Sequence, residues 1–396
     1  MGLLGQQGAH MLSITGGSAM LESGWAPCPL HVSEGIIQPP DDATTATLQI
    51  DATGLLALPG VIDIHGDAFE RSIMPRPGVS FALATALRDV DNQLVSNGIT
   101  TAFHGLTCSW EPGLRSLENS ISMMDALHQL KASFRCDMRV HLRHEVFNLD
   151  AEASILDWLA TGRIQALAFN DHMRGIVLSA GVKSKKIKQM AQRAGISDED
   201  FMSLIERVMA NEGHVSASLA RLAAAARLQG IPLLSHDDRH LEDLAAYSAL
   251  GCEISEFPMQ EEVAAAAIAA GGMTVFGAPN VLRGGSHIGC PSAAEMAQKG
   301  LCSILASDYY YPAILQAPFI LADRGLCTLA QAWALVSRNP ARALGLSDRG
   351  SLAPGKRADV VLVEANAGKA RLVATICGGE IAWLGDARRL TAPRGN

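Results

Sequence analysis

The sequence is poor in aromatic residues and lacks a long apolar run. Phe, Trp and Tyr together make up 5% of its 396 residues, so we expect a core built mainly from Ala, Leu, Val and Ile. No run of 18 or more apolar residues occurs, which argues against a membrane-spanning helix. The N-terminus also lacks the basic start and long apolar segment of a secretory signal. We therefore predict a cytoplasmic protein with no membrane partner.

The sequence also lacks an excess of positive charge and any closely spaced pair of cysteines. The formal net charge is −8, which argues against nucleic-acid binding, because a nucleic-acid partner normally requires a basic face. A small anionic substrate held by a few arginines remains compatible with this charge. None of the 8 cysteines forms a CxxC pair, so we expect buried free thiols in a reducing compartment.

The two ends of the chain share a strand–turn pattern that differs from the pattern of the middle. Residues 11–58 and 350–385 alternate short β-like runs with turns rich in Gly, Pro and Asp. We predict that they pair into one small β-sandwich domain. The predicted division is 1–58 and 346–396 for this domain and 59–345 for the larger unit.

The middle of the chain alternates short apolar runs with amphipathic helical stretches. Such alternation predicts a parallel sheet with right-handed crossovers, and eight strands fit an α/β fold of the (β/α)₈ TIM-barrel type, which takes about 250 residues. The eight runs are Gly60–Ile64, Thr100–His104, Met138–Glu145, Gln165–Asn170, Ile231–Ser235, Glu253–Phe257, Thr274–Pro279 and Cys302–Ser307.

Side chains that bind metals follow several of these predicted strands at the point where each strand ends. In a barrel of this type the carboxyl ends of the strands face one common site. One histidine at a strand end is usually structural, but convergence from four strands is difficult to explain in that way. Imidazole and carboxylate ligands without thiolate suit Zn²⁺, Mn²⁺ or Fe²⁺. The side chains concerned are His65, Asp67, His104, His141, Arg143, His144, Glu145, Asp171, His172, His236, Asp237, Asp238 and Asp308.

These residue types predict hydrolytic chemistry at one or two divalent metal ions per chain. Two metals can share a bridging carboxylate and a hydroxide, and the hydroxide is then the nucleophile. A carboxylate beside it can take and return the proton. For His104, His141 and His144 we favour hydrogen-bonded core histidines in at least two of the three cases.

Several motifs resemble those of the amidohydrolase superfamily. They are "LPGVIDIHGD" at the first strand, "SHDD", the "SD" of the last strand and the tail "NPARALGL", followed by "PGKRADVVLV". Longer stretches are similar to the diphosphatases of phosphonate metabolism, namely "HGDAFERSIMPRPGV", "GAPNVLRGGSHIG" and "LASDYYYPAILQAPF". This resemblance implies hydrolysis of a ribose 1-phosphonate 5-triphosphate to the 5-phosphate and pyrophosphate.

The resemblance also implies a role for each matching residue. Asp308 would bind metal and carry the proton as the catalytic residue, with Zn²⁺ as the expected metal and Mn²⁺ or Fe²⁺ as alternatives. The remaining ligands would be His65 and Asp67 for the first metal, Glu145 as the bridge, and His172 and His236 for the second metal. Members of the family are often homo-oligomers, so we expect one here.

Arginines near these motifs are candidates for binding the anionic substrate. Arg76, Arg143 and Arg283 are predicted to contact phosphate, with structural salt bridges as the alternative for Arg76 and Arg283. Ser286 and His287 are predicted to bind substrate as well, and His287 is also a candidate acid.

Two other functions remain open from the sequence. The chain reads His65-Gly66-Asp67-Ala68 where diphosphatases read HTDN, and "MRGIVLS" replaces their Pro-Gly-Gln-Arg-Gln-Phe run. These differences favour a related amidohydrolase that acts on a cyclic amide, an N-acyl group or a deaminable molecule. A barrel with a purely structural metal is a further alternative, but such sites are closed by four ligands and do not need a proton carrier such as Asp308.

Overall fold

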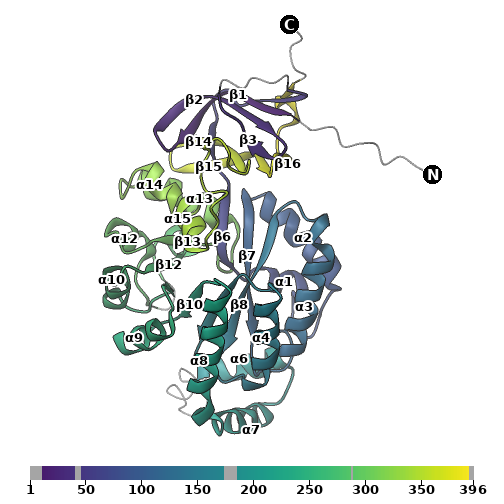
Figure 1. Cartoon of the computed structure of the whole chain (residues 1–396), viewed down its shortest axis with the longest axis vertical. Helices are drawn as coiled ribbons and strands as arrows, with labels where there is room; N and C mark the ends of the chain where they lie inside the picture. The colour runs from purple at the N-terminus through teal and green to yellow at the C-terminus, as the bar shows by residue number, and fades with distance from the viewer. Residues whose placement is uncertain (1–10, 41–45, 174–184, 287–288, 392–396) are drawn as a thin grey trace, which may run out of the picture.

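The computed structural model in Figure 1 describes residues 11–40, 46–173, 185–286 and 289–391. A small β domain holds the strands from both ends of the chain and lies at one end of the molecule. A larger barrel surrounded by helices occupies the rest.

The β domain is one mainly antiparallel sheet that combines both ends of the chain. Strand β14 pairs antiparallel with β5, so that Val361 lies opposite Leu58, and β17 pairs with β4. These pairings confirm the prediction that the two ends build one β domain. The strands of this sheet within the described residues are β1 (Leu12–Leu21), β2 (Gly24–Ser33), β3 (Ile36–Ile37), β4 (Leu48–Asp51), β5 (Leu56–Pro59), β14 (Val360–Asn366), β15 (Lys369–Cys377), β16 (Glu380–Leu384) and β17 (Leu390–Thr391).

The barrel is a parallel sheet whose strands neighbour each other in sequence order, which confirms the predicted TIM-type fold. It is nearly closed, because the last strand meets the first through the backbone of Asp308, whose N–H donates to the carbonyl of His65 at 2.9 Å. The strands are β6 (Val61–Gly66), β7 (Ile99–Cys108), β8 (Asp137–Glu145), β9 (Ala166–Asn170), β10 (Leu233–His236), β11 (Ile254–Glu256), β12 (Met273–Gly277) and β13 (Ile304–Ala306).

Helices pack around the outside of the barrel and bury their apolar faces against it. Side-chain caps set several of their starts: Ser116 accepts a hydrogen bond from the N–H of Asn119, and α3 begins at Leu117. The described helices are α1 (Phe69–Ile73), α2 (Leu83–Val95), α3 (Leu117–Leu130), α4 (Glu152–Ala160), α6 (Lys185–Ala194), α7 (Asp198–Met209), α8 (Glu212–Leu228), α9 (Leu241–Leu250), α10 (Glu261–Ala269), α11 (Ala278–Arg283), α12 (Ala293–Gln298), α13 (Pro312–Asp323), α14 (Leu329–Ala334) and α15 (Arg338–Ala343). In the described part of the chain, none of them is long and apolar enough to cross a membrane.

The interior of the barrel is closed at the amino ends of its strands. Ala341, Leu344 and Leu346 join the apolar cluster formed by inward-facing strand residues such as Ile64 and Leu234. The N–H of Ile62, near the start of β6, donates to the carbonyl of Val336, which places the segment before α15 at this end. The opposite end, where the polar strand ends converge, is therefore the end at which a site can form.

Candidate active site

Closure of the barrel brings its first strand, β6, and its last strand, β13, together beside one cavity. The backbone N–H of Asp67 donates to the carbonyl of Asp308 at 3.0 Å, so the residues after β6 and β13 lie side by side. Polar residues from distant segments line this cavity, among them His65, Asp67, Arg143, His236, Asp237 and Asp308.

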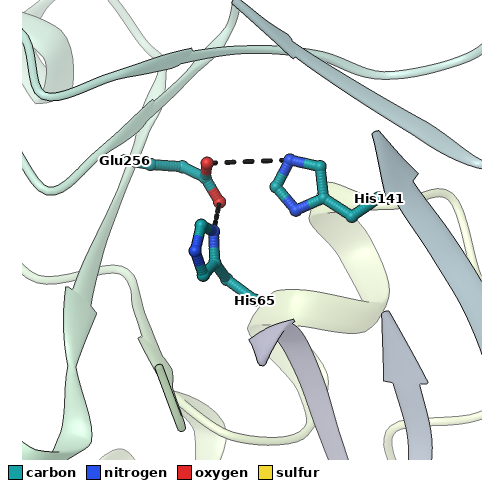
Figure 2. A group of neighbouring side chains, drawn as sticks. All are labelled: His65, His141 and Glu256. Atoms are coloured by element: carbon teal, nitrogen blue, oxygen red, sulfur yellow. Dashed lines mark hydrogen bonds and ion pairs between the residues drawn. The ribbon is translucent and has the colours of Figure 1, made fainter. Parts of the chain in front are cut away.

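A buried carboxylate, Glu256 at the end of β11, joins three imidazoles in this site. Its Oε1 lies 3.0 Å from Nδ1 of His65, and its Oε2 lies 3.2 Å from Nδ1 of His236. Oε2 also lies 3.6 Å from Nε2 of His141, and Figure 2 shows how the side chains of His65 and His141 approach the carboxylate. Strands β6, β8, β10 and β11 are thus connected through one side chain.

The contacts of Glu256 with Nδ1 of His65 and of His236 determine where Nε2 of each ring points. A carboxylate that accepts from Nδ1 fixes the ring orientation and leaves Nε2 as the atom that can bind a metal. At His65, a Cβ added to Gly105 would come within 3.4 Å of Nε2, so glycine at this position of β7 preserves the space around that atom. At His236, Nε2 lies 2.9 Å from Nη2 of Arg143.

The sequence predictions omitted Glu256, although a usable signal was present. The run Glu253–Phe257 is one of the predicted strands, and Ile254 lies in the apolar interior of the barrel. Side chains two residues apart on a strand share a face, so Glu256 also points inward. Its place at the end of a predicted strand is the same signal that indicates His236 and Asp308.

A second group of ligand-type atoms lies next to the first. His172, His236 and Asp237 each offer one atom, and these atoms all lie within 4.8 Å of one another. Asp237 Oδ2 is 3.7 Å from Nε2 of His172, while Oδ1 is 3.7 Å from Nε2 of His236. Glu145 Oε1 is 2.5 Å from Nδ1 of His172 and orients this ring from the other side.

The structure brings the six predicted metal ligands to one end of the barrel, with additional partners. Among the described residues, His65 lies in one group of donor atoms that could hold a metal, together with His141 and Glu256. His172 and His236 lie in a second such group, together with Asp237. The predicted ligands Asp67 and Asp308 line the same cavity, and Glu145 is bound to His172. The assignment of individual ligands stays a prediction.

The residues present fit a divalent metal. Burial lowers the pKa of His65 to about 3 and that of His141 to about 4, which keeps both rings in the neutral form that binds metals. Nε2 of His141 is buried without a hydrogen-bond partner in the described structure. The Glu145 carboxylate raises the pKa of His172 to about 9, so a metal at His172 would have to displace a proton.

Burial also raises the pKa values of two carboxyl groups in the site. The pKa of Asp308 is raised to about 7 by burial, and the nearby Asp67 carboxylate adds to the shift. Burial likewise raises the pKa of Glu256 to about 7. A carboxyl group whose pKa lies near neutrality can both accept and return a proton, which suits the role predicted for Asp308.

The backbone is in an unfavourable conformation at three of these strand ends. Asp237, Phe257 and Asp308 have φ values of 58°, 53° and 54°, in the left-handed region that residues other than glycine rarely adopt. Each such residue costs about 1–3 kcal/mol, and residues of this kind cluster at functional sites. They follow β10, β11 and β13, and all three line the cavity.

Asn170, at the end of β9, is another inward-facing residue that the sequence predictions omitted. Its backbone is paired with Glu145 on one side and with His236 on the other. Both side-chain amide atoms are buried and have no hydrogen-bond partner among the described residues. A buried amide without a partner is costly, so Asn170 has unused hydrogen-bonding capacity next to the candidate ligands.

The predicted substrate-binding residues lie at different depths. Arg143 is buried, with Nη1 3.9 Å from Oδ2 of Asp67, whereas Arg283 and Ser286 line the outer part of the cavity. Arg76 lies in an exposed turn and is not among the described residues that line the cavity. His287 lies outside the described residues.

Comparisons with known proteins agree with this fold and this residue chemistry. The model of the amidohydrolase family matches residues 56–382. The chain is 34% identical over 319 residues to the alpha-D-ribose 1-methylphosphonate 5-triphosphate diphosphatase of Escherichia coli (strain K12), covering 79% of this chain and 84% of that protein. It is also 32% identical over 155 residues to an imidazolonepropionase of Ruegeria pomeroyi, covering 36% of this chain and 38% of that protein.

A solved structure extends the likeness to the whole fold. The crystal structure of an amidohydrolase aligns with a TM-score of 0.64 at 14% identity and covers 95% of this chain and 100% of that chain. At this identity the likeness concerns the fold alone. The family match and the similarity to the diphosphatase together show that the chain belongs to the amidohydrolase family.

Proposed function

We propose that this amidohydrolase cleaves the phosphoanhydride of a ribose 1-phosphonate 5-triphosphate and releases pyrophosphate, as part of phosphonate catabolism. Water would add to phosphorus, the bond between the first and second phosphates would break, and the 5-phosphate would remain on the sugar. The similarity to the Escherichia coli diphosphatase over 79% of the chain supports this substrate class.

The observation that carries the proposal is the separation of charge along the cavity. Carboxylates and neutral imidazoles, including Asp67, His65 and His236, lie at its base and suit cations. Arg283 lies at its mouth and is exposed, which suits an anion. A triphosphate substrate needs a base that binds cations and a mouth that binds anions. Metal ions contact the reacting phosphate, while arginines bind the remaining phosphates.

The metal would be held by the imidazoles of His65, His172 and His236 with carboxylates between them, and we propose Zn²⁺, with Mn²⁺ or Fe²⁺ as alternatives, at one or two ions per chain. Such an ion, when bound, polarises a phosphoryl oxygen and lowers the pKa of water. The chain itself supplies Asp308, which would hold and return the proton, and Arg143, which neutralises charge at the base of the cavity.

The deciding experiment offers the metal-loaded protein α-D-ribose 1-methylphosphonate 5-triphosphate and follows the products by ³¹P NMR. We expect pyrophosphate and the 5-phosphate in equal amounts, with no orthophosphate. Nucleoside triphosphates and cyclic amides are offered in parallel. Hydrolysis of a cyclic amide without consumption of the triphosphate would reject the proposal.

An amide-type substrate is the second candidate, and one comparison favours it. The similarity to an imidazolonepropionase extends over 155 residues, and apolar side chains such as Phe257, Met259 and Phe276 line part of the cavity. A cyclic amide, an N-acyl compound or a deaminable molecule would use the same metals but would not need arginine at the mouth.

We also propose a cytoplasmic location and a homo-oligomeric state. All 8 cysteines are free thiols, which agrees with a reducing compartment. Size-exclusion chromatography with light scattering tests the oligomeric state.

A further inference from the structure

Two arginines approach one tyrosine of the cavity, Arg283 as a residue of the lining and Arg71 from beyond the lining residues. Tyr309 directly follows Asp308 and lines the cavity. Nη1 of Arg283, at the end of α11, donates a hydrogen bond to the Tyr309 hydroxyl at 3.4 Å. The guanidinium carbon of Arg71, in α1, lies 5.9 Å from the centroid of the Tyr309 ring. Two segments that follow different barrel strands therefore bring cations to the same aromatic side chain.

Neither of these arginines is paired with a carboxylate within the described part of the chain. Among the described residues, neither Arg71 nor Arg283 forms a salt bridge, and both are exposed. Arg115, which lies near the same helix, is instead bound to both carboxylate oxygens of Glu70 at 2.9 and 2.8 Å. Glu70 therefore forms its ion pair with Arg115 and not with Arg71, the next residue in the sequence. The guanidinium of Arg71 is thus available to a ligand.

The position of this pair relative to Asp308 indicates which part of a substrate it meets. Asp308 lines the cavity beside Asp67, whose backbone N–H donates to the carbonyl of Asp308 at 3.0 Å. Tyr309 is the next residue along the chain, and Arg71 and Arg283 are both exposed, so a group bound by these arginines is adjacent to the reacting centre and open to solvent. A leaving group departs toward the solvent.

We propose that Arg71 and Arg283 form an anion-binding clamp around Tyr309 that holds the diphosphate part released from the substrate. Arg71 is then a specificity-determining residue, which the sequence motifs did not indicate. The identity of the anion as a diphosphate rests on the proposed function. The existence of an anion-binding clamp rests only on the positions of the two arginines. Guanidinium groups suit this task because they offer paired N–H donors to phosphate oxygens.

Arg76 provides a matched control. It lies five residues after Arg71 in the same connection, and it is also an exposed arginine without a salt bridge among the described residues. Like Arg71, it is not among the described residues that line the cavity, but unlike Arg71 it has no contact with Tyr309 in the described structure. General electrostatic attraction would affect Arg71 and Arg76 alike, while a clamp would use Arg71 alone.

The experiment measures binding of inorganic pyrophosphate to the full-length, metal-loaded protein by isothermal titration calorimetry after removal of free metal. We expect Arg71→Gln and Arg283→Gln each to weaken binding about 10–100-fold, as expected for loss of a charge-assisted contact. Arg76→Gln should bind within about twofold of the wild type, and Arg71→Lys should recover part of the loss. Bound metal and the melting temperature are measured on each variant to verify that it is folded.

Steady-state kinetics separate failure of the clamp from failure of the proposed function. With a triphosphate substrate, Arg71→Gln should raise KM with little change in kcat. Wild-type pyrophosphate affinity in Arg71→Gln, or equal weakening in Arg71→Gln and Arg76→Gln, overturns the clamp even if the triphosphate is hydrolysed. Selective weakening in an enzyme that hydrolyses no triphosphate supports the clamp and rejects the proposed substrate.

Discussion

At the scale of single residues, Glu256 is the side chain that joins histidines from different strands of the barrel, and the motifs did not indicate it. Its two carboxylate oxygens contact Nδ1 of His65 and Nδ1 of His236, which come from β6 and β10. The carboxylate is buried, so it cannot exchange these partners for water. It can therefore act on a metal by orienting these two imidazoles, and it also belongs to the donor group that could hold a metal with His65 and His141.

We predict that Glu256→Gln weakens metal binding about 10–100-fold, as is typical when a residue that orients metal ligands is removed. A glutamine keeps the size of the side chain but has one accepting oxygen in place of two, so one of the two histidines loses its acceptor. The measurement is metal affinity by competition with a chromophoric chelator. Glu261→Gln, which removes an exposed carboxylate paired with Lys299, is the control. Unchanged affinity in Glu256→Gln would show that the histidines are held in another way.

The proton carrier gives a second prediction at this scale. Asp308→Asn should reduce kcat about 10²–10⁴-fold while the fold and much of the metal remain, because asparagine cannot carry a proton. The values of kcat, melting temperature and bound metal are measured on one preparation, with the exposed Asp323→Asn as the control. A variant with near-normal kcat would remove Asp308 from the mechanism, and a purely structural Asp308 would instead lower the melting temperature.

At the scale of structural elements, closure of the barrel depends on polar contacts between β6 and the end of β13. The buried carboxylate of Asp63 accepts hydrogen bonds from the backbone N–H of Ser307 at 3.0 Å and from its hydroxyl at 2.5 Å. Gly66 belongs to the same contact, because an added Cβ there would lie 2.8 Å from Oδ2 of Asp63. These contacts set the position of Asp308 relative to His65.

We predict that Ser307→Ala lowers the free energy of unfolding by about 1–3 kcal/mol, because a buried carboxylate loses one donor. The change is measured by thermal and denaturant unfolding. Ser133→Ala serves as the control, because its hydroxyl bonds the exposed carbonyl of Leu130. If Ser307→Ala unfolds like the wild type, this hydrogen bond does not hold the barrel closed.

At the scale of the whole molecule, ion pairs link the barrel to the segment that leads into the C-terminal strands. The side chain of Arg349 is nearly buried and donates to Asp137 at 2.7 Å and to the hydroxyl of Thr101 at 2.8 Å. Asp137 begins β8, so one arginine joins the floor of the barrel to residues that precede β14. The β domain and the barrel are thereby coupled by charge as well as by apolar packing.

This link predicts a pH dependence of stability. Burial alone would raise the pKa of Asp137, but hydrogen bonds and charge from Arg139 and Arg349 outweigh it and hold the pKa below the usual 3.8. The unfolded chain therefore binds this proton more readily, and the stabilisation is present above about pH 4 and lost as the pH falls through the folded-state value.

Asp137→Asn should consequently melt at a lower temperature than the wild type at pH 7, and the difference should shrink at the lowest pH at which both proteins fold. Melting temperatures across this range are the measurement, with Asp323→Asn as a variant expected to follow the wild type. A difference that stays constant with pH would mean that the charge of Asp137 does not contribute.

Much of the fold was predictable because its signals are local. All eight predicted barrel strands overlap observed ones, since apolar runs bounded by turns and amphipathic helices are properties of short segments. Pairing of the chain ends was also predictable from their shared strand–turn pattern. The prediction of a common site followed from the rule that parallel strands end on one face.

The exact partners within the site depend on tertiary structure. The apolar runs and the residues that follow them already placed His65, His236 and Asp308 at strand ends. Only the folded barrel decided that Glu256 binds two of the histidines and that Arg71, rather than Arg76, lies beside Tyr309. The physical reason is that these contacts join segments far apart in the chain, and their geometry depends on the register between strands and on closure of the barrel.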